Sequence, residues 1–141
     1  MNRPTFPVGV DVFVVRDRKL LLGTRIGTGY MDHTWGLPGG HLELQETMKG
    51  CAARELMEET GMMAEDFEFH SVVNDTARAP AHYVHVNFVA KHPQGEHEVK
   101  EPDRCTQWQW FSFDALPKDI FPGHAKQIEL FISDKNGFTE T

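Results

Sequence analysis

The sequence has few of the features that mark exported or membrane proteins. It has 141 residues and only two cysteines, Cys51 and Cys105, which form neither a CxxC pair nor a zinc-binding spacing. The N-terminal segment lacks the apolar core of a signal peptide, so we expect no export and two reduced, partly buried thiols. No apolar stretch approaches the roughly 20 residues that are needed to cross a bilayer. These absences predict a soluble, cytoplasmic protein with no membrane partner.

Basic residues and linkers are also scarce. The 14 Lys and Arg residues against 21 Asp and Glu residues give a net charge of −7, which argues against binding to a long nucleic acid. An anionic small molecule is compatible with this charge, because a bound cation or a local basic site can offset a mildly acidic surface. No Pro-, Gly- or Ser-rich linker and no repeat divides the chain. Residues 1–141 are therefore predicted to form one domain.

The pattern of apolar and turn residues predicts an α/β protein. The clearest helix runs from Glu46 to Thr60 and ends at Gly61, and a last helix runs from about Gly123 to Ser133. Strands are predicted at residues 8–15, 20–22, 67–73, 83–90 and 107–113. Turn residues predict loops at 27–30 and 35–40. This order favours a mixed sheet with helices packed on it.

Three carboxylates occupy one face of the first predicted helix. Glu55, Glu58 and Glu59 have the spacing i, i+3, i+4, which brings them to the same side of an α-helix. They lie in its last turn, where the helix dipole disfavours negative charge. A solvated helix tolerates this at a cost of some tenths of a kcal/mol, and a magnesium site would use the same three hard oxygen donors. The acids alone leave both interpretations open.

Residues 40–62 resemble the Nudix box of the MutT-like hydrolases. They read GHLELQETMKGCAARELMEETGM, and every fixed position of the box is filled. The matching residues are Gly40, Glu46, Arg54, Glu55, Leu56, Glu58, Glu59, Gly61 and Met62. Segments outside the box, such as 22–25, 82–84, 101–102 and 108–110, are most similar to the small nucleoside triphosphate pyrophosphohydrolases of the family. One departure is Gln45, where these relatives often have glycine.

The resemblance implies a fold and a set of catalytic residues. The fold would be an α/β/α sandwich with a mixed β-sheet, the box loop and helix on one face, and a C-terminal helix. The metal would be Mg²⁺, with Mn²⁺ as a substitute, and a homodimer is implied by the relatives. The predicted metal ligands are Glu55, Glu58, Glu59, the Gly39 carbonyl and Glu101. Glu46 and Arg54 would form an orienting ion pair, with an ordinary surface pair as the alternative.

Predictions for the substrate pocket rest on fewer residues. Arg25 resembles a family arginine that faces the substrate phosphate, and arginine can hold phosphate oxygens in a bidentate manner. His85, Trp35 and Phe121 are candidates for contacts with a nucleobase, because aromatic faces stack on bases. Each of these four residues has an alternative role in packing or on the surface. The other histidines, including His124, are predicted to lie at surface and loop positions.

Three functions are compatible with this pattern. The first is divalent-metal-dependent hydrolysis of a normal or modified nucleoside triphosphate to the monophosphate and pyrophosphate. The second keeps this chemistry and changes the substrate to ADP-ribose, a dinucleoside polyphosphate or a nucleotide sugar. The third is a non-catalytic nucleotide-binding module. The intact carboxylates argue against the third, because a site that only binds has no need for a repulsive cluster.

Overall fold

The computed structural model describes residues 2–27, 29, 31–135 and 137–140, so residues 28 and 30 of the predicted loop at 27–30 lie outside the described residues. Its two helices are α1 (Met48–Thr60) and α2 (Pro122–Ile132). Its strands are β1 (Val8–Phe13), β2 (Val15–Arg16), β3 (Lys19–Arg25), β4 (Trp35–Gly36), β5 (Gly39–His41), β6 (Asp66–Asp75), β7 (Tyr83–Lys91), β8 (Cys105–Ser112) and β9 (Gly137–Glu140). The predicted mixed α/β architecture is confirmed.

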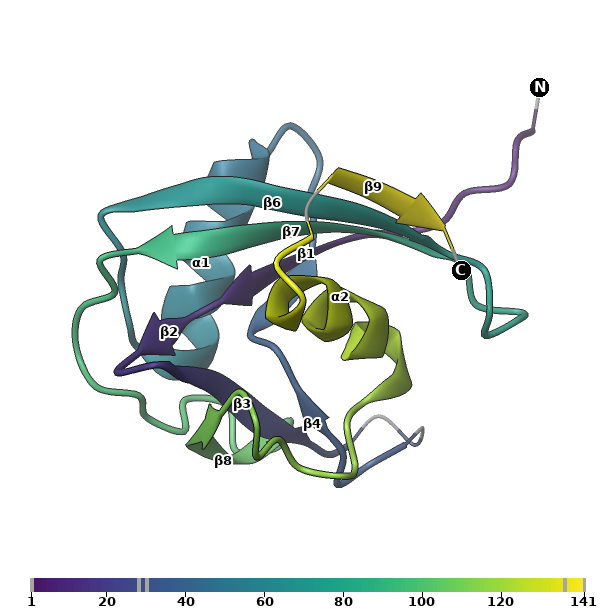
Figure 1. Ribbon diagram of the computed structural model, residues 1–141. Coiled ribbons are helices and arrows are strands. Elements are labelled where there is room, and N and C mark those ends of the chain that lie inside the picture. The colour runs from purple at the N-terminus through teal and green to yellow at the C-terminus, as the bar shows by residue number, and fades with distance from the viewer. Residues whose placement is uncertain (1, 28, 30, 136, 141) are drawn as a thin grey trace.

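The strands form two sheets, and the chain passes from the larger to the smaller one where β1 runs on into β2 (Figure 1). The larger sheet has the order β5-β1-β7-β6-β9, in which β1 pairs with β7 and β6 with β9 in parallel while the other pairs are antiparallel. The smaller sheet joins β2, β3 and β4, and β8 pairs with β3. The larger sheet is therefore mixed, as the sequence predicts.

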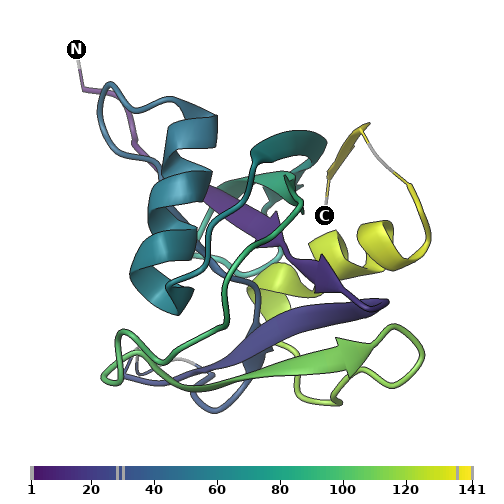
Figure 2. The same ribbon diagram turned by 90° about the vertical axis from the view of Figure 1, so that its left-hand side faces the viewer.

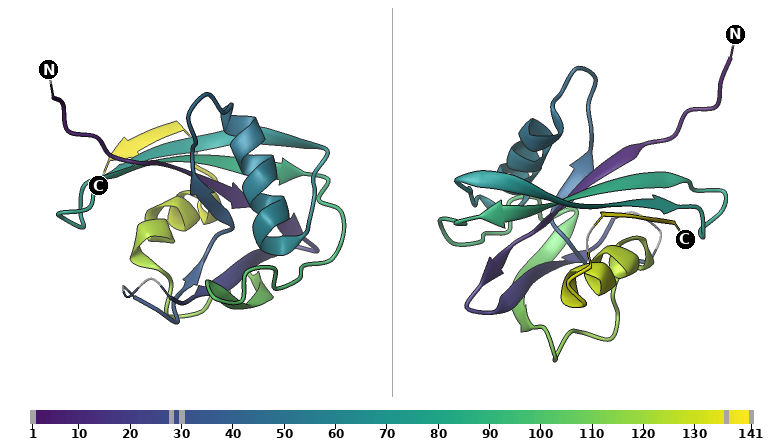
Figure 3. Two further views of the ribbon diagram at one scale, coloured as in Figure 1. Left: turned by 180° about the vertical axis from the view of Figure 1, so that it is seen from behind. Right: turned by 45° about the horizontal axis from the view of Figure 1, so that its top comes forward.

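Strand β1 is buried on both faces, which explains its nearly continuous apolar sequence. Val10 and Val12 face a core that includes Leu56 of α1. Phe13 points the other way, into a second core that includes Ile128 of α2. Figure 2 shows the two helices on opposite sides of β1, and Figure 3 shows α1 lying across the larger sheet.

Local capping sets the ends of α1. The Thr47 side chain accepts a hydrogen bond from the Gly50 N–H at 3.0 Å, so the helix begins at Met48, two residues later than predicted. At the other end Gly61 adopts a left-handed φ of 75°, as predicted from its lack of a side chain. The cap thus leaves Glu46 in the preceding loop.

The predicted loop at 35–40 was only partly correct. Its residues contribute to the short strands β4 and β5, which are too brief to show an alternating pattern. The predicted strands at 67–73 and 107–113 are observed as the longer β6 and the shifted β8, and β9 was not predicted. Gln45 adopts a φ of +67°, a conformation that favours glycine. This backbone explains why glycine would be the easier residue at that position.

Candidate active site

A cleft of about 1160 Å³ contains most of the residues singled out in the sequence. Its walls come from β1, β3, β5, α1, β7, β8 and the start of α2. Of the predicted site residues, those that line it are Gly39, Arg54, Glu55, Glu58, Glu59, Glu101, Arg25, His85 and Phe121. The cleft therefore brings together residues from nearly the whole length of the chain.

One wall of the cleft is acidic. Glu55 and Glu59 of α1 face β5, where the Gly39 N–H donates to Glu59 Oε1 at 2.7 Å. The neighbouring Gly40 leaves room for the Glu55 carboxylate, since a Cβ at that position would collide with it. Glu58 is the most exposed of the three, with 48% of its side chain accessible. The helix thus presents carboxylates directly against a glycine-rich turn.

Burial makes this cluster costly to ionise. It raises the pKa of Glu59 to about 8, and the nearby Glu55, Glu101 and Asp11 add to the shift although the Gly39 N–H opposes it. The pKa of Glu55 is also raised, chiefly by burial, with Arg54 opposing the shift and Glu58 and Glu101 adding to it. Carboxylates in such surroundings favour a bound cation.

The donor set fits a divalent cation that prefers oxygen. Glu55, Glu58 and Glu59 supply carboxylate oxygens, and Glu101 lines the same cleft close enough to raise the pKa of both Glu55 and Glu59. Carboxylate and carbonyl oxygens suit Mg²⁺ and Mn²⁺ better than softer metals. A cation would offset the repulsion that the metal-free cluster carries.

Arg54 connects the box loop to the acidic face. Its Nε and Nη2 donate to the two carboxylate oxygens of Glu46 at 2.6 and 3.0 Å, a bidentate pair. Its Nη1 donates to Glu55 at 2.8 Å and to Glu58 at 3.3 Å. The hydrogen bond from Arg54 is the main reason that the pKa of Glu46 falls to about 2. The predicted pair is thus formed, and it holds the arginine between the loop and two of the candidate ligands.

The family resemblance implies a metal-dependent hydrolase in which Glu46 and Arg54 orient the ligands. On that basis we expect Glu46→Gln to lower kcat about 10- to 100-fold, the usual contribution of residues that orient metal ligands. The amide keeps the size of the side chain but removes the charge that anchors Arg54. Steady-state kinetics at saturating Mg²⁺ measure the effect. Glu68→Gln is the matched control, since Glu68 pairs with Lys91 at 3.5 Å on the surface. Unchanged kcat in Glu46→Gln would mean that the pair is only structural.

Trp35 does not lie among the residues that line the cleft. Its ring instead packs edge-on against Phe111, with centroids 4.9 Å apart, in the second core. Phe121 does reach the cleft, and the Arg25 guanidinium lies over its ring at 3.9 Å from the centroid. Arg25 and Phe121 therefore form one surface, from which Trp35 is separate.

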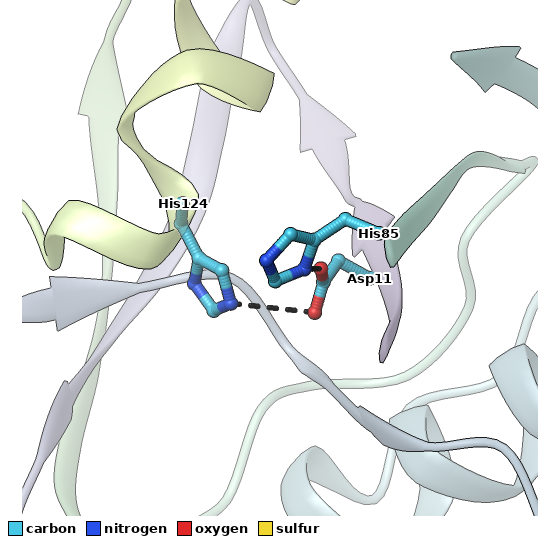
Figure 4. Close-up of side chains that lie close together, drawn as sticks. All are labelled: Asp11, His85 and His124. Atoms are coloured by element: carbon cyan, nitrogen blue, oxygen red, sulfur yellow. Dashed lines mark hydrogen bonds and ion pairs between the residues drawn. The ribbon is translucent and has the colours of Figure 1, made fainter. Parts of the chain in front are cut away.

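A buried polar cluster at the deep side of the cleft was largely missed. Asp11, His85 and His124 approach one another there (Figure 4), and each is at most 5% exposed. The prediction of a surface or loop position for His124 is wrong, because it lies in the first turn of α2 and its Nδ1 accepts the Leu37 N–H at 2.9 Å. One available signal was Asp11, a charge within an otherwise apolar strand.

Two hydrogen bonds explain why a carboxylate is tolerated at this depth. His85 Nδ1 lies 2.9 Å from Asp11 Oδ2, and His124 Nε2 lies 3.3 Å from Asp11 Oδ1. Burial alone would raise the pKa of Asp11, but the electrostatic interactions and hydrogen bonds with these two histidines hold that pKa well below its usual range. Asp11 is therefore a carboxylate that accepts from both rings.

A glycine-rich turn, an acidic helix face and the Arg54–Glu46 ion pair beside it suit a protein that holds a divalent cation to hydrolyse an anionic substrate. The sequence model of the NUDIX domain family matches residues 5–131 of this chain. The chain is 31% identical over 131 residues to the ADP-ribose pyrophosphatase of Methanocaldococcus jannaschii, covering 92% of this chain and 75% of that protein.

Two further comparisons agree with this match. The chain is 28% identical over 127 residues to the oxidized purine nucleoside triphosphate hydrolase of Mus musculus, covering 88% of this chain and 78% of that protein. The crystal structure of a MutT NUDIX hydrolase from Burkholderia pseudomallei superposes with a TM-score of 0.82 at 31% identity, covering 89% of this chain and 98% of that one. The chain spans only 47% and 48% of the lengths of two other curated relatives. The chain belongs to the Nudix hydrolase family.

Proposed function

We propose that this Nudix hydrolase is a Mg²⁺-dependent pyrophosphohydrolase that converts a nucleoside triphosphate, normal or modified, to the monophosphate and pyrophosphate. The observation that carries the proposal is the composition of the cleft. One wall gathers the carboxylates Glu55, Glu58, Glu59 and Glu101, and the other carries Arg25 over Phe121. A molecule with a polyphosphate at one end and a flat base at the other matches both walls.

The residues of the acidic wall would hold the metal. Glu55, Glu58, Glu59 and the Gly39 carbonyl are the proposed ligands, with Glu101 as a further ligand or a proton acceptor. A bound Mg²⁺ would neutralise phosphate oxygens and lower the pKa of attacking water. One of these carboxylates would accept the proton of that water. Arg54, held by Glu46 at 2.6 Å, would keep the ligands oriented.

The opposite wall would position the phosphates and the base. Arg25 Nε is buried and has no hydrogen-bond partner among the described residues, which leaves a donor for a phosphate oxygen. The guanidinium lies on Phe121, so the arginine is already held in place before substrate arrives. Preorganised donors of this kind stabilise charge that develops during the reaction.

The names of the relatives support hydrolysis of nucleotide derivatives, but they differ in the substrate. The mouse relative is named for oxidized purine nucleoside triphosphates, which agrees with the proposal. The archaeal relative is named for ADP-ribose and is the more similar in sequence at 31% identity, which makes ADP-ribose the second candidate. A non-catalytic binding module is disfavoured, because the carboxylates of the acidic wall are all present.

A hydrolysis screen with product identification tests the proposal. The substrates are the four dNTPs, 8-oxo-dGTP, 5-methyl-dCTP, ADP-ribose and a dinucleoside polyphosphate, each with Mg²⁺ and with a chelator. We expect monophosphate and pyrophosphate from one or a few triphosphates, and only with the metal. Activity on ADP-ribose or a dinucleotide alone would move the assignment to the second candidate. No hydrolysis of any of these substrates would contradict the proposed triphosphate activity and move weight to a binding module or to an untested substrate.

Two predictions concern the cellular location and the oligomeric state of the protein. Within the described residues, no helix is long and apolar enough to span a membrane. The cytoplasmic location and the homodimer stay predictions, supported by composition and by the family resemblance respectively.

A further inference from the structure

The buried cluster of Asp11, His85 and His124 is open to a metal-site interpretation, because one ligand atom from each lies within 4.8 Å of the others. The hydrogen bonds argue against it. His124 Nδ1 accepts the Leu37 N–H, so the ring proton lies on Nε2, the nitrogen that faces Asp11. A metal ligand needs a lone pair at that nitrogen. Binding a metal would therefore require His124 to give up its bond to Leu37.

The same reasoning places a proton on one nitrogen of His85. Asp11 Oδ2 can only accept, so the His85 nitrogen 2.9 Å away, Nδ1, carries a proton. Gly9 permits this arrangement, since an added Cβ there would lie 3.1 Å from that nitrogen. In a neutral ring the other nitrogen, Nε2, is then a lone-pair acceptor. Tyr83 stacks on the ring at 5.4 Å between centroids and 12° between planes, which holds its orientation.

His85 Nε2 lacks a hydrogen-bond partner in the part of the chain that the structure describes, although it is buried. The Asp75 carboxylate lies 3.7 Å from it, too far for a hydrogen bond. Arg78 holds this carboxylate at 2.7 Å. An acceptor beside a carboxylate attracts a hydrogen-bond donor and repels another acceptor. His85 lines the cleft, so a ligand is a natural source of that donor.

We propose that His85 is a specificity-determining residue whose Nε2 accepts a hydrogen bond from the amino group of a nucleobase, and that Asp11 is the positioning residue that keeps this nitrogen available. The proposal rests on the proposed function, since it concerns the base end of the same cleft. It selects bases with an exocyclic amino group at ring position 4 or 6 over bases with a carbonyl oxygen there. A carbonyl oxygen would face two acceptors, His85 Nε2 and Asp75.

Histidine NMR of the ligand-free protein tests the first step without any need for activity. With ¹⁵N-labelled histidine, we expect the proton of His85 on Nδ1 and that of His124 on Nε2. In Asp11→Asn we expect His85 to lose its preference for the Nδ1–H form. A carboxylate accepts at both oxygens, whereas the amide of asparagine accepts at one end and donates at the other, so it can pair with either form of the ring. A doubly protonated His85, or a proton on Nε2 in the wild type, would overturn the proposal. So would stoichiometric Zn²⁺ shifting the signals of both histidines.

Paired substrates test the second step. We expect kcat/KM to be at least about tenfold higher for dCTP than for dUTP, or for dATP than for dITP. The oxo base loses one hydrogen bond, and its carbonyl oxygen faces another acceptor. His85→Gln should reduce this ratio to within about threefold, because either end of an amide can face the base. His92→Gln, at an exposed residue outside the cleft lining, should leave the ratio unchanged. A ratio unaltered in His85→Gln would contradict the proposal.

Failure of the proposed function gives a different result. If no triphosphate is hydrolysed, equilibrium binding of CMP against UMP and of AMP against IMP still measures amino against oxo selection. Selection that His85→Gln removes would uphold the role of His85 without turnover. Tight binding of both members of each pair with equal affinity would refute it.

Discussion

Replacing Glu58 with glutamine is expected to lower Mg²⁺-dependent kcat by about 10²- to 10³-fold, the range found when one preorganised electrostatic contact to the reacting charge is removed. Glu58 is the most exposed of the three helix carboxylates, with 48% of its side chain accessible. Among the described residues, its hydrogen-bond partner is Arg54, whose Nη1 donates to it at 3.3 Å. The substitution should therefore leave folding almost unchanged, because exposed ion pairs contribute only about 0–1 kcal/mol to stability.

The comparison of activity with stability makes this test specific. Glu129→Gln is the matched control, since Glu129 is an exposed helix residue whose carboxylate lies 3.6 Å from Lys126. Both variants should unfold at nearly the wild-type urea midpoint, and only Glu58→Gln should lose turnover. Near-wild-type turnover in Glu58→Gln would remove this residue from the metal site.

Mg²⁺ titration separates loss of binding from loss of chemistry. If Glu58 is a ligand, the metal concentration that gives half-maximal activity should rise in Glu58→Gln, and excess Mg²⁺ should recover part of the turnover. An unchanged metal dependence with low kcat would instead indicate that Glu58 is the proton acceptor. Both outcomes keep the residue at the active site and differ in its role.

The helical part of the acidic wall was predictable from the sequence because it is local. Glu55, Glu58 and Glu59 lie within a few residues of one another, and helical periodicity alone places them on one face. The pairing of Glu46 with Arg54 spans eight residues and came from the family resemblance, and the structure shows it at 2.6 Å. Short-range geometry therefore fixed most of this half of the site.

The buried polar cluster of Asp11, His85 and His124 depends on contacts between distant segments. Asp11 and His85 are separated by 74 residues, and Gln127 reaches the same carboxylate at 3.4 Å from 116 residues away. No periodicity links such positions, because the pairing of β1 with β7 brings the first two together. His124 could not be assigned from sequence for this reason. Trp35 does not line the cleft, although an aromatic ring could stack on a nucleobase. Residue type alone does not determine which way a side chain faces.

The short strands illustrate a similar limit. Strand β4 has two residues and β5 has three, and alternation cannot be recognised over so few positions. Their pairing with β3 and β1 nevertheless positions the turn that faces Glu59. The elements that were hardest to predict thus complete the site that was easiest to predict.

Glu59→Gln is expected to make the metal-free protein more stable at alkaline pH. Burial raises the pKa of Glu59 to about 8 from 4.5, so the unfolded chain ionises at lower pH than the folded one. The native state is not penalised below about pH 4.5, loses stability as the pH rises toward 8, and carries the whole cost above that. Glutamine cannot ionise, and its Oε1 can still accept the Gly39 N–H.

Urea unfolding at pH 5 and pH 9 in the presence of a chelator measures this effect. At pH 9 the free energy of unfolding of the variant should exceed that of the wild type by on the order of 5 kcal/mol, since each pKa unit corresponds to about 1.4 kcal/mol. At pH 5 the difference should be small, and Glu129→Gln should follow the wild type at both values. Parallel pH profiles for wild type and Glu59→Gln would show that Glu59 is ionised at little cost.

Adding Mg²⁺ should reverse the ranking at pH 9. A cation bound at the carboxylates favours their charged form, so it stabilises the wild type by an amount that grows with metal concentration. Glu59→Gln lacks one charged ligand and should gain less. The same buried carboxylate would thus weaken the empty protein and strengthen the loaded one, which is the behaviour expected of a residue whose position is set by the metal it binds. If Mg²⁺ stabilises both proteins equally, Glu59 is not a ligand, and its burial needs another cause.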